Sequence, residues 1–157
     1  MLLDGISHLE LFEARMIVEP ELAARAAERA TAEDVTNLRR IIAEMKENVS
    51  DRERLIELDI AFHDTIFQAA GNRVCRQMFR VIHRLILASI TRLSLRADLD
   101  AVMEAHKSIY SAIASRDPAG ARANMANHLN AARGLFLRDG EEAAPQAKKA
   151  QSSRKKG

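Results

Sequence analysis

The stretch SDRERLIELDIAFHDTIFQAAGN, residues 50–72, carries the pattern that decides the fold. Its apolar residues recur every three or four positions, which is the period of one face of an α-helix. Ser50 and Glu53 have the spacing of a capping box at a helix start, and Gly71 is a typical residue at a helix end. We therefore expect a helix from Ser50 to about Gly71 with one buried face.

The buried face of this predicted helix contains two polar residues. The face is formed by Leu55, Asp59, Phe62, His63, Ile66 and Ala70. Asp59 and His63 are about one helical turn apart, so their side chains can converge on one point. Because an unpaired buried charge is very costly, an ionised Asp59 in this position needs a cation or dense hydrogen bonding.

The same reasoning extends outward along the chain and predicts five more helices. They cover residues 9–29, 31–48, 73–96, 99–115 and 118–138. Thr31, followed by acids, and Asp117, followed by Pro118, have the character of helix starts. Pro20 should bend or divide the first helix. Because no segment alternates with the period of a strand and the links are short, we expect an all-α fold, an antiparallel bundle of six or seven helices.

Two of these further helices also carry a polar residue on an apolar face. His106 interrupts the row Val102, Ile109 and Ile113, and His128 interrupts the row Ala121, Met125, Ala132 and Leu135. A lone histidine on such a face is more often a hydrogen-bonded core residue, but three histidines with a carboxylate suit a divalent transition metal. We therefore expect Asp59, His63, His106 and His128 to bind such an ion, with zinc or nickel as first choices, since magnesium and calcium prefer oxygen ligands.

Arg15 is a further polar residue on an apolar face, which it shares with Leu11, Val18 and Leu22. Arginine is rarely buried without a partner, and its planar fork suits a carboxylate. The pattern leaves three roles open for Arg15. It could bind the carboxylate of a ligand, form an internal salt bridge to Asp or Glu, or extend its head to solvent at the end of the bundle.

Four other polar residues complete the list of those considered. Ser89 and Arg92 end the row Val74, Met78, Val81 and Leu85 in the fourth helix. They could contact a ligand cavity, or they could lie where the helix runs out into solvent. His8 precedes the first predicted helix and His83 lies among arginines, so we expect both to be solvated.

The composition is that of one soluble helical domain. The chain has 157 residues, of which 47% are hydrophobic, 29% charged and 4% aromatic, an ordinary foldable balance. Cys75 is the only cysteine, so no intrachain disulfide can form, and no apolar run is long enough to cross a bilayer. These features favour a cytoplasmic protein without a membrane partner.

The net charge of +2 is unevenly distributed. Residues from Glu141 onward carry +3, which leaves −1 on the rest of the chain. A near-neutral body is not typical of a DNA-binding surface, and a basic tail is usually solvated. We divide the chain into a leader (1–8), a helical bundle (9–139) and a basic flexible tail (140–157).

Four segments of the sequence resemble a known family. They are LFEARMIVEPELAARAAERATAED (11–34), DIAFH (59–63), EAHKSIYSAI (104–113) and RDPAGARANMANHL (116–129). They are similar, in order and over about residues 9–138, to the FCD effector domain of the FadR subfamily of GntR transcription regulators. The resemblance implies an antiparallel helical bundle that forms a homodimer and binds a metal through one Asp and three His. Those four positions fall on Asp59, His63, His106 and His128.

The resemblance also implies a ligand and a DNA partner. In this family small organic acids bind beside or onto the metal, and Arg15 is a plausible partner for a carboxylate. A winged helix-turn-helix usually precedes the FCD domain, and eight residues cannot form one. We therefore expect DNA binding only through such a domain outside this sequence.

These features rank three functions. The leading one is a metal-dependent sensor domain that detects an organic acid and controls DNA binding by rearranging a dimer. The alternative is a mononuclear-metal enzyme acting on a small carboxylate, against which we find no Glu-x-x-His pair and no separate base or nucleophile on the same faces. A third is a structural metal, although structural zinc sites often use cysteine. We expect the chain not to be an enzyme.

Overall fold

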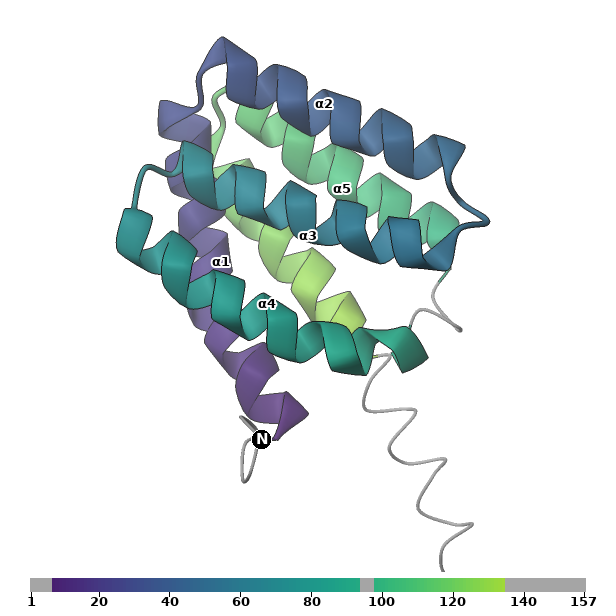
Figure 1. Ribbon diagram of the computed structural model, residues 1–157. Coiled ribbons are helices and arrows are strands. Elements are labelled where there is room, and N and C mark those ends of the chain that lie inside the picture. Colours follow the sequence, from purple (N-terminus) through teal and green to yellow (C-terminus); the bar gives the residue numbers. More distant parts are fainter. Residues whose placement is uncertain (1–6, 94–97, 135–157) are drawn as a thin grey trace, which may run out of the picture.

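The computed structural model describes residues 7–93 and 98–134, without the side chains of His8 and residues 84–93. The described residues form α1 (His8–Arg29), α2 (Ala32–Glu47), α3 (Arg52–Ala69), α4 (Arg73–Leu93) and α5 (Leu99–Ala114), followed by a last helix over 118–134 (Figure 1). This part of the chain contains no strand, which confirms the all-α fold. The expected basic tail and most of the expected leader lie outside the described residues.

Side-chain caps begin two of these helices where the sequence indicates. Thr31 and Asp34 form a capping box at the start of α2, and the Asp117 carboxylate accepts a hydrogen bond from the backbone N–H of Gly120 at 2.9 Å. The expected start of α3 at Ser50 is wrong. Its N-cap is Asp51, whose carboxylate accepts from the backbone N–H of Arg54 at 3.0 Å. A negative charge at a helix N-terminus favours this choice.

Pro20 does not divide the first helix, contrary to one of the two outcomes expected. The helix runs unbroken from His8 to Arg29 with Pro20 inside it. An interior proline costs about 3 kcal/mol or more because it removes a backbone donor and crowds the preceding turn. Packing of α1 against α3, α4 and α5, with Pro20 itself buried, offsets that cost.

The core lies where α3 crosses the bundle. Helix α3 packs between α2 and α4, with α1 on its other side, and α5 packs on α1 and α2 (Figure 1). The largest fully buried apolar side chains are Leu38, Phe62, Ile66, Phe67, Ile109, Ile113, Met125 and Leu129. His63, His106 and Glu19 are buried as completely as these apolar residues. Polar groups at this depth require partners, which the next section describes.

Candidate metal centre

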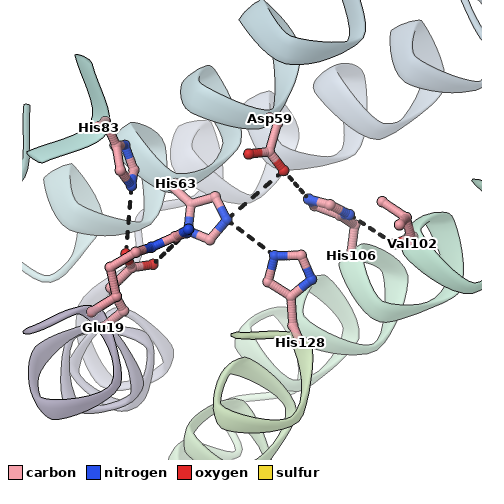
Figure 2. A network of polar contacts seen from close by, with 8 residues as sticks. Glu19, Asp59, His63, His83, Val102, His106 and His128 are labelled. Atoms are coloured by element: carbon pink, nitrogen blue, oxygen red, sulfur yellow. Dashed lines mark hydrogen bonds and ion pairs between the residues drawn. The ribbon is translucent and has the colours of Figure 1, made fainter. Parts of the chain in front are cut away.

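Four side chains from three helices converge in the interior of the bundle (Figure 2). Asp59 and His63 come from α3, His106 from α5 and His128 from the last helix. One nitrogen or oxygen atom of each lies within 4.8 Å of the corresponding atoms of the other three. The fold therefore brings together the four residues that the sequence indicates as metal ligands.

The spacing of these atoms suits ligands around one ion. The Nε2 atom of His106 is 3.0 Å from Oδ1 of Asp59. The Nε2 atom of His63 is 3.3 Å from Nε2 of His128 and 4.0 Å from Oδ1 of Asp59. Around a tetrahedral zinc ion with bonds of about 2.0–2.1 Å, neighbouring ligand atoms lie roughly 3.3 Å apart. Small side-chain adjustments would bring all four atoms to one ion.

In its neutral form, His106 presents a nitrogen without a hydrogen to this cluster. Its Nδ1 lies 2.8 Å from the carbonyl oxygen of Val102, and a carbonyl only accepts hydrogen bonds, so Nδ1 carries the hydrogen. In the neutral ring Nε2 then has a lone pair, yet it faces an oxygen of the Asp59 carboxylate. Two acceptors 3.0 Å apart repel each other unless a proton or a metal cation lies between them.

The surroundings favour an ionised Asp59 and neutral rings for His63 and His128. Burial acts to raise the pKa of Asp59, but the contact with His106 and the electrostatic effect of the three nearby histidines outweigh it and lower that pKa. Burial lowers the pKa of His63, and burial together with the neighbouring histidines holds the pKa of His128 well below its usual value. An ionised carboxylate and neutral imidazoles are the forms that bind metal.

Glu19 forms a second layer behind His63. The sequence analysis did not identify this residue. Its side chain is fully buried, and its Oε2 lies 2.7 Å from Nδ1 of His63. Opposing the desolvation that would raise it, the charges of Arg15 and His63 lower the pKa of Glu19 well below its usual value. The sequence does contain a signal for this residue, because Glu19 lies one turn after Arg15 and extends the same buried face.

Arg15 forms the internal salt bridge that was one of its three possible roles. Its Nε is 2.5 Å from Oε1 of Glu19 and its Nη2 is 3.5 Å from Oε2. The Arg15 residue is only 3% exposed, so its head does not extend to solvent. A contact between Arg15 and the carboxylate of a ligand stays a prediction.

The expectation that His83 is solvated is wrong. His83 is 6% exposed, and its Nε2 lies 3.5 Å from Oε1 of Glu19. The arginines beside it in the sequence are misleading, because His83 lies one turn after Phe79, which is buried in the core. On α4 the row Val74, Met78 and Val81 faces outward, since these residues are 68%, 60% and 53% exposed.

Three polar residues of the sequence analysis fall outside what the structure describes. The side chains of Ser89 and Arg92 in α4, and that of His8 at the start of α1, belong to the part of the chain whose side chains are not described. Their expected roles therefore stay predictions.

Fold and site together define a small helical domain with a buried cluster of carboxylates and histidines. Residues 10–131 match the family model described as the FCD domain, and the chain belongs to that family. None of the helices in the described part of the chain has the length and apolar content needed to cross a membrane.

The curated relatives of this chain are transcriptional regulators. The galactonate operon transcriptional repressor of Escherichia coli is 35% identical over 107 residues, which is 67% of this chain and 47% of the repressor. The HTH-type transcriptional regulator LutR of Bacillus subtilis is 29% identical over 76% of this chain and 58% of its own length. The chain thus spans about half the length of these relatives, both of which are named as regulators of transcription.

Solved structures show the same fold. GntR of Streptococcus agalactiae aligns with a TM-score of 0.70 and 25% identity, over 83% of this chain and 62% of that chain. McbR/YncC of Escherichia coli aligns with a TM-score of 0.76 over 85% of this chain and 71% of that chain, at 17% identity. The helical bundle is therefore shared with a GntR regulator well beyond the residues that the sequences have in common.

Proposed function

We propose that the chain is the effector-binding domain of a GntR-type transcription regulator and that it detects a small organic acid through a bound divalent transition metal. The observation that carries the proposal is the 3.0 Å contact between Nε2 of His106 and the Asp59 carboxylate, where a neutral His106 ring with its hydrogen on Nδ1 offers only a lone pair. His63 and His128 direct their Nε2 atoms to the same place (Figure 2). A metal cation there would compensate the carboxylate and accept the three imidazoles.

The charge of the site favours an anionic ligand. Arg15 and Glu19 neutralise each other, whereas a divalent ion bound to Asp59 would retain one positive charge. A set of three histidines and one aspartate leaves positions open on ions that take five or six ligands, and an acid's carboxylate oxygen suits such a position. The Asp59 side chain is 29% exposed, which places the cluster within reach of solvent. We infer a compact acid with one or two carboxylates and not an acyl chain.

The relatives suggest which acids to test first. The Escherichia coli relative is named as the repressor of a galactonate operon, and galactonate is a hydroxy acid of the proposed class. Arg15 would contribute to binding such an acid only with the part of its guanidinium that Glu19 does not occupy. The metal would therefore supply the principal contact.

The proposed regulation follows from a shift in the equilibrium between two packing arrangements of the helices. An acid that binds one packing more tightly would favour it, and in a homodimer this would change the spacing of attached DNA-binding domains. DNA would be contacted by a winged helix-turn-helix outside this chain, in the cytoplasm. The exposed row of α4, Val74, Met78 and Val81, is the surface that we assign to the dimer.

Metal content tests the first half of the proposal. Elemental analysis and native mass spectrometry of gently purified protein should find about one transition-metal ion per chain, and His63→Ala, His106→Ala and His128→Ala should each lose it, because a ligand set of this kind needs its imidazoles. Asp59→Asn and Asp64→Asn form a matched pair on α3, since Asp64 is bound by Arg76 and is not a member of the cluster. Normal metal content in all three histidine variants would end the proposal.

Calorimetry tests the second half. Hydroxy, keto and dicarboxylic acids are titrated into metal-loaded protein and into protein stripped with a chelator. We expect an acid to bind the loaded form without being turned over, and to bind the stripped form much more weakly. Equal binding to both forms would place the acid away from the metal.

A further inference from the structure

Glu19 has more partners than charge neutralisation requires. Its fully buried carboxylate already forms an ion pair with Arg15, with Oε1 2.5 Å from the guanidinium Nε. The other oxygen, Oε2, lies 2.7 Å from Nδ1 of His63. Burying a second polar contact on the same carboxylate indicates a role directed at His63 itself.

His63 turns its two nitrogens in opposite directions. Nδ1 faces Glu19, and Nε2 faces the cluster, 3.3 Å from Nε2 of His128 (Figure 2). An ionised carboxylate only accepts hydrogen bonds, so the hydrogen of a neutral His63 ring belongs on Nδ1. The Nδ1 of His63 forms no hydrogen bond of standard geometry in the structure, so one of the two side chains must rotate to complete the bond to Oε2. The Nε2 lone pair then points to the cluster.

We propose that Glu19 is a positioning residue, which holds His63 in the tautomer with hydrogen on Nδ1 and its Nε2 directed at the metal, and that Arg15 holds Glu19 in place. The proposal rests on the proposed metal binding. A carboxylate that accepts a hydrogen bond from a ligating imidazole fixes the ring and makes it a better ligand. Loss of such a partner typically lowers metal affinity by about 10- to 100-fold.

The surroundings of Glu19 argue against a second metal site. Glu19, His63 and His83 also bring ligand atoms within 4.8 Å of one another. However, the nearest oxygen of Glu19 to His83 is Oε1, at 3.5 Å, and this is the oxygen that the Arg15 guanidinium occupies. A cation bound there would lie against the positive charge of Arg15, which disfavours it.

The first test reads the tautomer of His63 in metal-free protein. Long-range nitrogen–proton NMR of protein labelled with nitrogen-15 distinguishes a ring with hydrogen on Nδ1 from one with hydrogen on Nε2. We expect the Nδ1 form for His63 in the wild type and a shift towards a mixture in Glu19→Gln. A purely structural Glu19 would change thermal stability without moving these signals. The Nε2 form in the wild type would overturn the proposal.

The second test measures zinc affinity by competition with a chromophoric chelator. Glu19→Gln should bind zinc about 10- to 100-fold more weakly than the wild type. Glu21→Gln is the matched control, because Glu21 lies on the same helix but is exposed and paired with Arg122. If Glu19→Gln folds poorly, zinc affinity is measured instead on the double variant Arg15→Met with Glu19→Met. This variant removes both buried charges together, so neither is left without a partner.

The outcomes separate this proposal from the proposed function. A wild type that binds no zinc would refute metal binding, whereas zinc affinity unchanged in both Glu19→Gln and the double variant would refute only the role of Glu19. The proposal would be overturned if the wild type bound two zinc ions per chain and His83→Ala lost the second, because Glu19 would then belong to a second metal site.

Discussion

Arg15 and Glu19 place two opposite charges inside the bundle, at 3% and 0% exposure. Removing one partner of a buried ion pair leaves the other charge without compensation, which typically costs about 3–5 kcal/mol. Arg15→Ala should therefore lower the free energy of unfolding by about this amount in chemical denaturation. Arg122→Ala breaks the exposed pair with Glu21 and should cost far less. Similar losses in the two variants would show that Glu19 finds another partner when Arg15 is gone.

The lowered pKa values of His63 and His128 make the stability of metal-free protein depend on pH. The unfolded chain takes up protons at these rings near the ordinary histidine value of about 6.5, whereas the folded protein resists them to lower pH. Where the unfolded state binds more protons, stability rises with pH. The melting temperature should therefore fall as the pH is lowered from about 7.5 to about 5.5, the interval that begins above the ordinary histidine pKa.

A variant checks the assignment of this pH dependence. His128→Leu removes one of the two groups, so its melting temperature should fall less steeply over the same interval. A wild-type melting temperature that stays constant or rises on acidification would contradict the lowered pKa values. An identical slope in His128→Leu would assign the effect to other groups.

At the scale of the element, α4 has two apolar rows, and only one of them faces the core. Phe79 and His83 are buried against the bundle, whereas Val74, Met78 and Val81 lie on the outer side. Three exposed apolar side chains spaced by four and three residues form a continuous strip on a helix. A strip of this kind on a protein surface is typical of an interaction site.

We expect Met78→Glu to convert a dimer into a monomer, because it places a charge at the centre of this strip. Light scattering or analytical ultracentrifugation at high micromolar concentration would measure the mass. Ala43→Glu adds the same charge at an exposed position of α2 and should leave the mass unchanged. A wild type that is already monomeric, or a Met78→Glu variant that stays dimeric, would show that the strip is not the contact.

At the scale of the whole molecule, the sequence was sufficient to predict the helices and to mark the four cluster residues as interior. Asp59, His63, His106 and His128 each interrupt an apolar row, so periodicity alone marks them as interior residues. Helices α3 and α5 both pack against α1 and α2, and one nitrogen or oxygen atom of each of the four residues lies within 4.8 Å of those of the others. Periodicity could not show which helices contact one another, because it identifies the buried face of a helix but not the helix that packs against that face.

The same limit explains the residues that sequence reasoning placed wrongly. Helix α4 has apolar residues on two sides, and the sequence does not say which side meets α3. The inner and outer rows could therefore not be told apart, and His83 was expected to be solvated. Glu19 was overlooked because a carboxylate one turn after an arginine is common on exposed helix surfaces. Only the packed bundle shows that both charges lie inside.

The unequal exposure of the cluster suggests how quickly an ion would enter and leave it. Asp59 keeps 29% of its side chain open to solvent, whereas His63 and His106 are closed off completely. An arriving ion would bind the carboxylate first. It would then exchange its remaining coordinated water molecules for the imidazoles buried deeper in the bundle. Its escape would wait for a local opening of the bundle, which is a rare event in a packed core. We therefore expect a slow off-rate, so that a loaded domain keeps its ion through short changes in metal supply and reports the concentration of acid alone.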